Sequence, residues 1–307
     1  MDRRELLGRI SRLPLLAEGL ATSMLAGSFR SVFRGQGMEF DEARHYQWGD
    51  DARSIDWNAS TRLGAPFVKV FREERELGLF LLLDTSASMH GGMARPFGQG
   101  TGDRRLSPYE QALIASALVT FAADRNGQRV GAFLFDRGID RVFPLRAGRR
   151  NILAFVSAAL KYQDAEAGPS RTDLPASNLL SAIAAANLLL KRKSLVIIVS
   201  DFLNIGWEQE LGRLARRHDV VAVRVFDPAE SDPPDLGLLD AADTETGTRI
   251  AAPTGSAPFR EAWRLWHAER AALWRKLCRR AGASPLELPV TEDVTAVLTR
   301  FFGNRIN

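Results

Sequence analysis

Runs of consecutive apolar residues alternate along the chain with segments in which apolar residues recur at helical spacing. A run that is apolar on successive positions predicts a strand buried on both faces. Such runs, with one partly polar strand, lie at 77–84, 129–135, 139–143, 194–200 and 219–226. Helical spacing predicts helices over 107–125, 148–161, 173–191 and 206–217. This alternation predicts an α/β fold with a mostly parallel central sheet flanked by helices.

The C-terminal third continues the pattern after an interruption. An acidic, proline-rich stretch ends at Asp235, and two short strand candidates follow near 236–240 and 248–252. These predict a hairpin insertion at about 231–256. A helix over 258–281, a last strand near 284–288 and a closing helix over 291–302 are expected to complete the sheet.

The first thirty residues carry one apolar stripe at helical spacing. The stripe consists of Leu6, Ile10, Leu13, Ala17, Leu20 and Met24. Pro14 lies inside it and is expected to bend or split the helix. Most such stripes pack on their own domain, so a helix offered to a partner is the weaker alternative. We therefore expect a helical segment at 1–30, an extension at 31–76 and the main domain at 77–307.

Composition is that of a soluble protein with a substantial core. The 307 residues include 45% hydrophobic and 25% charged residues, and the net charge is only +4. No basic stripe with stacking aromatics or reader motif occurs, so a nucleic-acid partner is not indicated. No apolar run approaches bilayer length, which disfavours direct membrane anchoring. A single cysteine, Cys278, and the lack of a signal-peptide core lead us to expect a cytoplasmic protein.

A carboxylate and two hydroxyls follow the first buried strand directly. Asp84 ends the run Leu-Phe-Leu-Leu-Leu, and Ser86 and Ser88 come next at two-residue spacing. In open α/β sheets, ligands bind beyond the carboxyl ends of the strands. Hard oxygen donors of this kind suit Mg²⁺ or Mn²⁺ better than zinc. Taken alone, the two serines are equally typical of turn capping.

An octahedral ion needs more oxygens than this stretch supplies, and two other segments offer them. Asp201 follows the buried run 195–200, so its position should match that of Asp84. Thr172 lies in a loop that leads into a predicted helix, and such loops also gather above strand ends.

At this point the chain resembles the von Willebrand factor A domain. The metal-ion-dependent adhesion site of that family is Asp-x-Ser-x-Ser, a distant Thr and a later Asp that ends a strand. The resemblance implies a Rossmann-like fold and assigns metal binding to Asp84, Ser86, Ser88, Thr172 and Asp201. It also implies that one coordination position accepts a carboxylate from a partner protein.

A second resemblance comes from the stretch upstream. Residues 35–40 (GQGMEF) and 44–57 (RHYQWGDDARSIDW), followed by Ser60, Arg62 and Gly64, resemble the domain-of-unknown-function family numbered fifty-eight. That family pairs this block with an A domain. The resemblance implies a non-enzymatic adaptor or chaperone-like partner of a MoxR-type AAA+ ATPase, binding the motor or its client.

The same block has a structural interpretation. Its acids, bases and aromatics alternate with glycines, which suits tight turns held by ion pairs in a small β-rich extension. The charged residues concerned are Asp50, Asp51, Arg53, Asp56 and Arg62. A contact with a partner protein is the alternative.

Enzymatic alternatives fit less well. A phosphotransferase of the haloacid-dehalogenase type needs a second acid two residues after the first Asp, where this chain has Ser86. The glycine-rich loop 91–102 lacks the Gly-Lys-Ser/Thr ending of a phosphate loop and is expected to be a surface loop, with control of access to the metal as the weaker alternative. The four histidines have no zinc spacing. A Mg²⁺-dependent phosphatase or related hydrolase using the same ion is the remaining alternative.

Overall fold

A computed structural model describes residues 3–24, 38–48, 50–51, 55–73, 78–91, 106–162, 178–242 and 249–305. The chain divides into two compact units, of which the smaller is Phe33–Glu76. The larger unit contains Met1–Val32 and Leu77–Asn307, so the N-terminal helix belongs to the same unit as the central sheet. The predicted metal ligands all fall in the larger unit, while Thr172 and residues 92–102 of the glycine-rich loop lie outside the described residues.

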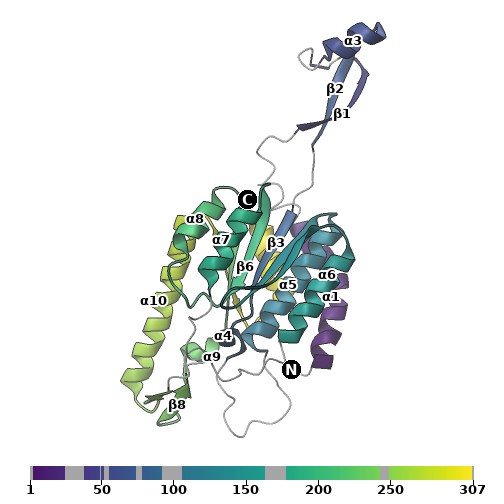
Figure 1. Ribbon diagram of the computed structural model, residues 1–307. Coiled ribbons are helices and arrows are strands. Elements are labelled where there is room, and N and C mark those ends of the chain that lie inside the picture. The colour runs from purple at the N-terminus through teal and green to yellow at the C-terminus, as the bar shows by residue number, and fades with distance from the viewer. Residues whose placement is uncertain are drawn as a thin grey trace. The chain divides into compact units, whose positions relative to one another are not determined.

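A six-stranded sheet is the centre of the larger unit (Figure 1). Its order is β10-β7-β6-β3-β4-β5, and all neighbours are parallel except β4 and β5. The strands are β3 (Gly78–Asp84), β4 (Arg129–Phe135), β5 (Ile139–Arg146), β6 (Ser194–Ser200), β7 (Asp219–Phe226) and β10 (Ser284–Pro289). The fold class predicted from the sequence is thereby confirmed.

The chain builds the sheet outward from β3 in one direction, through β4 and β5, and then returns to add β6, β7 and β10 on the other side of β3. The neighbours β3 and β6 therefore lie at the switch point of the sheet. Counted along the chain within this sheet, β3 is the first strand and β6 the fourth, and the order is that of a doubly wound fold. Every residue of β3 and of β6 is buried, because helices cover both faces. Ligands bind at such a switch point, which here lies at the ends of β3 and β6.

Helices cover the sheet on both sides (Figure 1). One face carries α7 (Leu179–Leu189), α8 (Glu208–Ala215) and α10 (Ala257–Ala281), and their core includes Phe80 and Trp274. The other face carries α5 (Pro108–Arg125), α6 (Arg149–Ala159) and α11 (Val294–Asn304), with α1 (Arg3–Met24) packed on α5 and α11. A single 3₁₀ turn, η3 (Leu160–Tyr162), follows α6.

The N-terminal helix α1 completes a layer around α5. Ile10, Leu13, Ala17, Leu20 and Met24 are buried, which confirms that this stripe packs on the domain. The side chain of Leu6 lies outside the described residues. Pro14 stays within one continuous helix rather than splitting it.

Burial of α5 goes further than its sequence indicates. The capping box of Ser107 and Glu110 and the proline at the first helical position start this helix as expected. The sequence predicts one buried face, yet every residue from Pro108 to Ala123 is buried, because the sheet, α1 and α11 surround the helix. Among the polar side chains of this covered helix, Gln111 donates its amide N–H groups to the Pro289 and Glu292 carbonyls and so ties α5 to the end of β10 and the segment after it.

His218, between α8 and β7, is buried, and among the described residues neither of its ring nitrogens has a hydrogen-bond partner. Burial lowers the pKa of its imidazole from 6.5 to about 4. The unfolded chain therefore takes up a proton below pH 6.5 that the folded protein does not, so this histidine lowers stability as pH falls through that window. The wild type should lose this stability as pH falls, whereas His218→Leu should not. We therefore expect the difference in unfolding free energy between His218→Leu and wild type to increase by about 1–2 kcal/mol, in favour of the variant, when the pH is lowered from 7 to 4.5. Urea unfolding across this range measures it, and a pH-independent difference would contradict the assignment.

The smaller unit contains two paired strands, and a short helix connects them along the chain. β1 (Met38–His45) and β2 (Phe67–Glu73) are antiparallel, and α3 (Trp57–Leu63) lies between them in the chain. The helix is an addition to the predicted β-rich extension. Asp56 caps its N-terminus by accepting from two backbone N–H groups, and Gly64 ends it with φ of +72°.

Ion pairing in this unit matches the structural interpretation of its charges. Arg44 makes a two-pronged ion pair with Asp50 at 2.7 and 2.8 Å, and the Asp50 carboxylate also accepts the Gln47 N–H. The Arg44 guanidinium holds the pKa of Asp50 below its ordinary value. Asp56 likewise serves as a helix cap, whereas Arg53 lies outside the described residues.

Beyond β7, the chain forms a turn of helix and a hairpin before returning to the sheet. α9 (Pro228–Ser231) leads to the antiparallel strands β8 (Leu239–Ala242) and β9 (Arg249–Ala252), where the sequence predicts a hairpin. Helix α10 then runs past the sheet, so that its first half and the hairpin extend from the same edge as α4 (Ala87–His90) and α9 (Figure 1). Cys278, near the end of α10, is fully buried, which agrees with its expected packing role.

None of the helices in the described part of the chain combines the length and the apolar character needed to span a bilayer.

Candidate metal centre

The carboxylates of Asp84 and Asp201 lie at the ends of neighbouring strands. Asp84 is the last residue of β3, and Asp201 directly follows β6. Because β3 and β6 are parallel and paired in register, both side chains come to the same edge of the sheet. Asp84 is 1% exposed, and the negative charge of Asp201 contributes to raising its pKa, so the two carboxylates interact.

The hydroxyls of Ser86 and Ser88 lie together beside these carboxylates. Ser86 occupies the N-cap position of α4, but its side chain makes no capping hydrogen bond. Its Oγ atom lies 3.1 Å from the Oγ atom of Ser88 instead. The Ser86 side chain therefore does not cap α4, and the two hydroxyls lie within hydrogen-bond distance of each other.

Hydrogen bonds from neighbouring groups hold the Asp84 carboxylate. Its Oδ1 atom accepts the Ser86 N–H at 3.0 Å, and its Oδ2 atom accepts the Ser200 hydroxyl at 2.6 Å. The second bond links β3 to β6 across the switch point. Burial nevertheless raises the pKa of Asp84 well above its ordinary value, and the charge of Asp201 raises it further. A positive charge nearby would offset both effects.

Asp201 has one oxygen bonded and one without a partner. Oδ1 accepts the Leu203 N–H at 3.0 Å, whereas Oδ2 is buried and has no hydrogen-bond partner among the described residues. Burial raises the pKa of Asp201, and the nearby Ser88 hydroxyl lowers it in part. An unsatisfied buried carboxylate oxygen is costly, and in native proteins it often marks an ion site.

The residue after Asp201 has an unusual backbone conformation. Phe202 has φ of +53°, and it is the one non-glycine residue with positive φ in the described part of the chain. This conformation costs about 1–2 kcal/mol for a bulky L-residue and is commonly found at functional sites. The ring of Phe202 packs against Trp207 and Trp274, which holds the turn that follows the metal edge.

Two arginines, Arg224 and Arg270, lie close enough to Asp201 to influence its pKa. Arg224 on β7 is mostly buried and pairs with Glu287 at 3.3 Å, and Glu287 also binds Arg275 on α10 at 2.8 Å. Arg270 on α10 donates to the carbonyl of Leu203. The charges of Arg270 and Arg224 both lower the pKa of Asp201, so they favour its ionised form.

These residues fit a small divalent cation. The donors brought together are carboxylate and hydroxyl oxygens, which Mg²⁺ and Mn²⁺ prefer. No group of three or more His, Cys, Asp or Glu suited to a metal occurs in the described ranges, which leaves this mixed set as the candidate there. Thr172, the fifth predicted ligand, stays a prediction because it lies outside the described residues.

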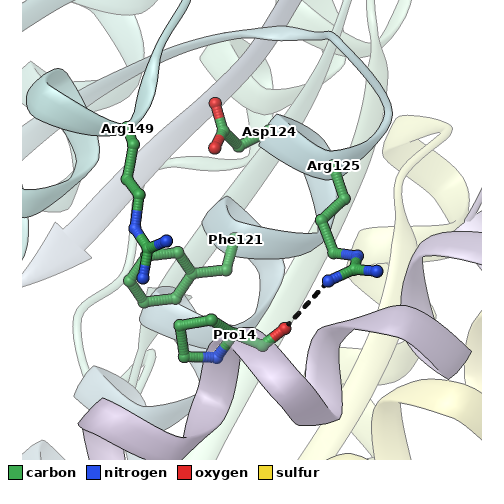
Figure 2. A pocket seen from close by; sticks show the side chains of 5 residues that line it. All are labelled: Pro14, Phe121, Asp124, Arg125 and Arg149. Carbon is green, nitrogen blue, oxygen red and sulfur yellow. Dashed lines mark hydrogen bonds between the residues drawn. The ribbon is translucent and has the colours of Figure 1, made fainter.

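A small recess elsewhere in the larger unit has different chemistry (Figure 2). Pro14, Phe121, Asp124, Arg125 and Arg149 line it, and Arg125 donates to the Pro14 carbonyl at 3.4 Å. It lies near the C-terminal end of α5, whereas the N-terminal end of this helix is close to α4. The recess therefore belongs to the α1–α5 contact rather than to the metal edge.

Three residues of the site were not singled out from the sequence. Ser200 was read only as the end of a strand, and Arg224 and Arg270 only as parts of elements. A hydroxyl at the last buried position of an apolar run is a usable signal for Ser200. Nothing local indicates the two arginines, because they reach Asp201 from β7 and from α10.

Mycobacterial proteins are similar to this chain in sequence. Uncharacterized protein Rv1480 of Mycobacterium tuberculosis and uncharacterized protein Mb1516 of Mycobacterium bovis are each 31% identical over 99% of this chain and 91% of their own length. An uncharacterized Mycobacterium avium protein, MAV169, is 34% identical over 42% of this chain and 76% of its own length.

Solved structures with a similar fold include protein BatB from Bacteroides thetaiotaomicron. It is 15% identical, has a TM-score of 0.43, and the match covers 75% of this chain and 98% of BatB. The VWA domain of SpRpn10 is 11% identical with a TM-score of 0.38, covering 73% of this chain and 94% of that domain. Residues 42–272 match the family described as "Protein of unknown function DUF58". The chain therefore belongs to the DUF58 family.

Proposed function

We propose that this chain is a non-enzymatic, metal-dependent protein-interaction module. In this proposal Asp84, Ser86, Ser88 and Asp201, together with Thr172, hold Mg²⁺ or Mn²⁺, directly or through water. The observation that carries it is the buried Oδ2 atom of Asp201, which has no hydrogen-bond partner in the described residues although it lies at the same sheet edge as Asp84. A divalent cation would supply the missing partner and offset the repulsion between the two carboxylates.

The proposed ligands of this chain leave room for a further oxygen ligand from a partner protein. Mg²⁺ requires six oxygens in octahedral geometry and readily takes a carboxylate among them. An acidic side chain from another protein would complete that shell, as the resemblance to the adhesion site implies. Such a contact needs ligands and a complementary surface only, whereas hydrolysis also needs a nucleophile or base aimed at the ion.

The choice of partner follows from what the resemblance of residues 35–64 to the DUF58 family implies. We propose a MoxR-type AAA+ ATPase, or the client of that motor, as the protein that presents the acidic side chain in the cytoplasm. The chain would then act as an adaptor or chaperone-like partner of the motor.

The test measures binding and turnover separately. Isothermal titration with Mn²⁺ should detect a site in the wild type that is lost in Asp201→Ala and kept in Asp124→Asn, which changes a carboxylate of the recess in Figure 2. Binding to the purified MoxR-type ATPase of the same genome should require Mg²⁺ and weaken more than about tenfold in Asp201→Ala.

A phosphatase assay with p-nitrophenyl phosphate covers the alternative. We expect no turnover above a buffer control at any Mg²⁺ concentration. Turnover that disappears in Asp201→Ala would overturn the interaction module in favour of a hydrolase. Mn²⁺ binding that is intact in Asp201→Ala would overturn the metal site itself.

A further inference from the structure

Large apolar side chains are exposed immediately after the metal edge. Leu203 and Ile205 lie on the loop that follows Asp201, and Ile205 is 89% exposed. Trp263, Trp266 and Leu273 on α10 are also exposed, Trp266 at 48%. We call these five residues, with Arg270, the α10 ridge. Exposed apolar surface of this extent on one side of a site is typical of an interaction surface.

Helical spacing aligns the α10 members of the ridge. Positions 263, 266, 270 and 273 are three or four residues apart, so their side chains lie along one side of the helix. The guanidinium of Arg270 lies 5.1 Å from the centre of the Trp266 ring, and Trp263 and Trp266 are 5.8 Å apart. Trp263, Trp266 and Arg270 thus form a line of contacting side chains within the ridge.

Two hydrogen bonds attach the ridge to the elements of the metal edge. Arg270 donates to the carbonyl of Leu203, two residues beyond Asp201. The indole N–H of Trp263 donates to the carbonyl of Glu230 on α9, at 2.7 Å. The strained Phe202 sets the direction of the loop between Asp201 and Leu203. Hence the first ridge residue, Leu203, lies two residues after the candidate metal ligand Asp201.

The positive charge of the ridge indicates the charge of the partner segment that would bind it. Helix α10 contains seven Lys and Arg residues and two Glu residues. Arg260, Arg264 and Arg275 have carboxylate partners in the larger unit, whereas Arg270 has a carbonyl partner and an aromatic neighbour. An acidic segment complements Arg270, and it complements a bound cation for the same reason. Trp and Arg are also the residues most often found at the energetic centre of protein interfaces.

We propose that the α10 ridge binds the partner segment whose acidic side chain completes the metal site. The segment is acidic and carries at least one large apolar side chain, which packs on Ile205 and Trp266 while the carboxylate binds the cation. This inference rests on the proposed function, and it adds the chemistry of the partner segment to it.

Peptide selection tests the proposal without knowledge of the natural partner. A phage-displayed library of random peptides is selected on the immobilised full chain in Mg²⁺, and enriched peptides are made with a fluorescent label. We expect them to combine Asp or Glu with a nearby aromatic or aliphatic residue. Fluorescence anisotropy then compares wild type with Ile205→Ser, Trp266→Ala and Asp84→Ala.

Each ridge variant should weaken binding about tenfold or more, as expected for an interface anchor. Asp84→Ala or EDTA should abolish binding. The matched control is Leu188→Ser, which changes an exposed leucine near the C-terminal end of α7 and should alter affinity less than about twofold. The substituted ridge side chains are exposed, so the variants should fold like the wild type. Thermal melting checks this.

Other outcomes separate the two proposals. Mg²⁺-dependent acidic peptides that bind both ridge variants like wild type would overturn the ridge and leave the proposed function standing. Peptides that need the ridge but bind equally in EDTA and in Asp84→Ala would overturn the proposed function and the joint site. Absence of enriched peptides, or Mg²⁺-dependent self-association that Ile205→Ser abolishes in sedimentation velocity, would overturn the assignment to an acidic partner segment.

Discussion

In EDTA at pH 7.5, Asp84→Asn is expected to be more stable than the wild type by on the order of 1–2 kcal/mol. Burial and the neighbouring Asp201 raise the pKa of Asp84 in the folded protein above its ordinary value of 3.8. The unfolded chain therefore ionises at lower pH than the folded one, and the metal-free folded state becomes less favourable as pH rises above 3.8. Asn removes the charge and keeps an oxygen for the Ser86 N–H. Urea unfolding followed by tryptophan fluorescence measures the difference.

Saturating Mg²⁺ should reverse this order. A cation that binds the folded state alone stabilises it by mass action, and loss of a carboxylate ligand should weaken that binding by more than about 100-fold. The wild type should thus gain stability in Mg²⁺ while Asp84→Asn does not. Asp124→Asn is the control and should respond to Mg²⁺ like the wild type. Equal stabilisation of Asp84→Asn and wild type by Mg²⁺ would contradict the assignment of Asp84 as a ligand.

Leu20→Ala is expected to lower the unfolding free energy by about 2–4 kcal/mol. The side chain of Leu20 is fully buried where α1 packs on α5 and α11. Its removal leaves a cavity beside a helix that is surrounded on all sides, so neighbouring groups can relax only in part. Urea unfolding of the full chain measures the loss.

Leu15→Ala on the same helix is the matched control. Leu15 is 78% exposed, so its truncation should change stability by less than about 0.5 kcal/mol. If α1 were a helix held ready for a partner instead of part of the core, both substitutions would have similarly small effects on the isolated protein. That result would contradict the packing of α1 described above.

Much of the larger unit could be predicted because its local signals agree with its environment. The strands 129–135, 194–200 and 219–226 have the predicted bounds, since apolar runs of this length have few alternatives other than a buried strand. The helix Trp57–Leu63 was missed, although Asp56 and Gly64 bracket it with ordinary capping residues. Its short length and mixed polarity give no periodic signal, so only the caps could have indicated it.

The candidate site was predictable to the extent that its residues end strands. Asp84 and Asp201 follow apolar runs directly, and parallel pairing brings such positions to one edge. Ser200 was missed because its role depends on a bond across the sheet to Asp84. The ridge was missed because helical spacing places Trp263 and Trp266 on one side of their helix without indicating whether another element covers that side. They are exposed because α10 extends past the sheet.

By itself, the sequence determined the order of strands and helices in the main domain and which carboxylates end its strands, because hydrophobic burial acts on patterns within single segments. Only the tertiary structure decided that α5 is covered on every side, that one oxygen of Asp201 has no partner among the described residues, and that an exposed aromatic ridge starts beside it. These properties depend on which distant segments pack together, and no local pattern contains that information.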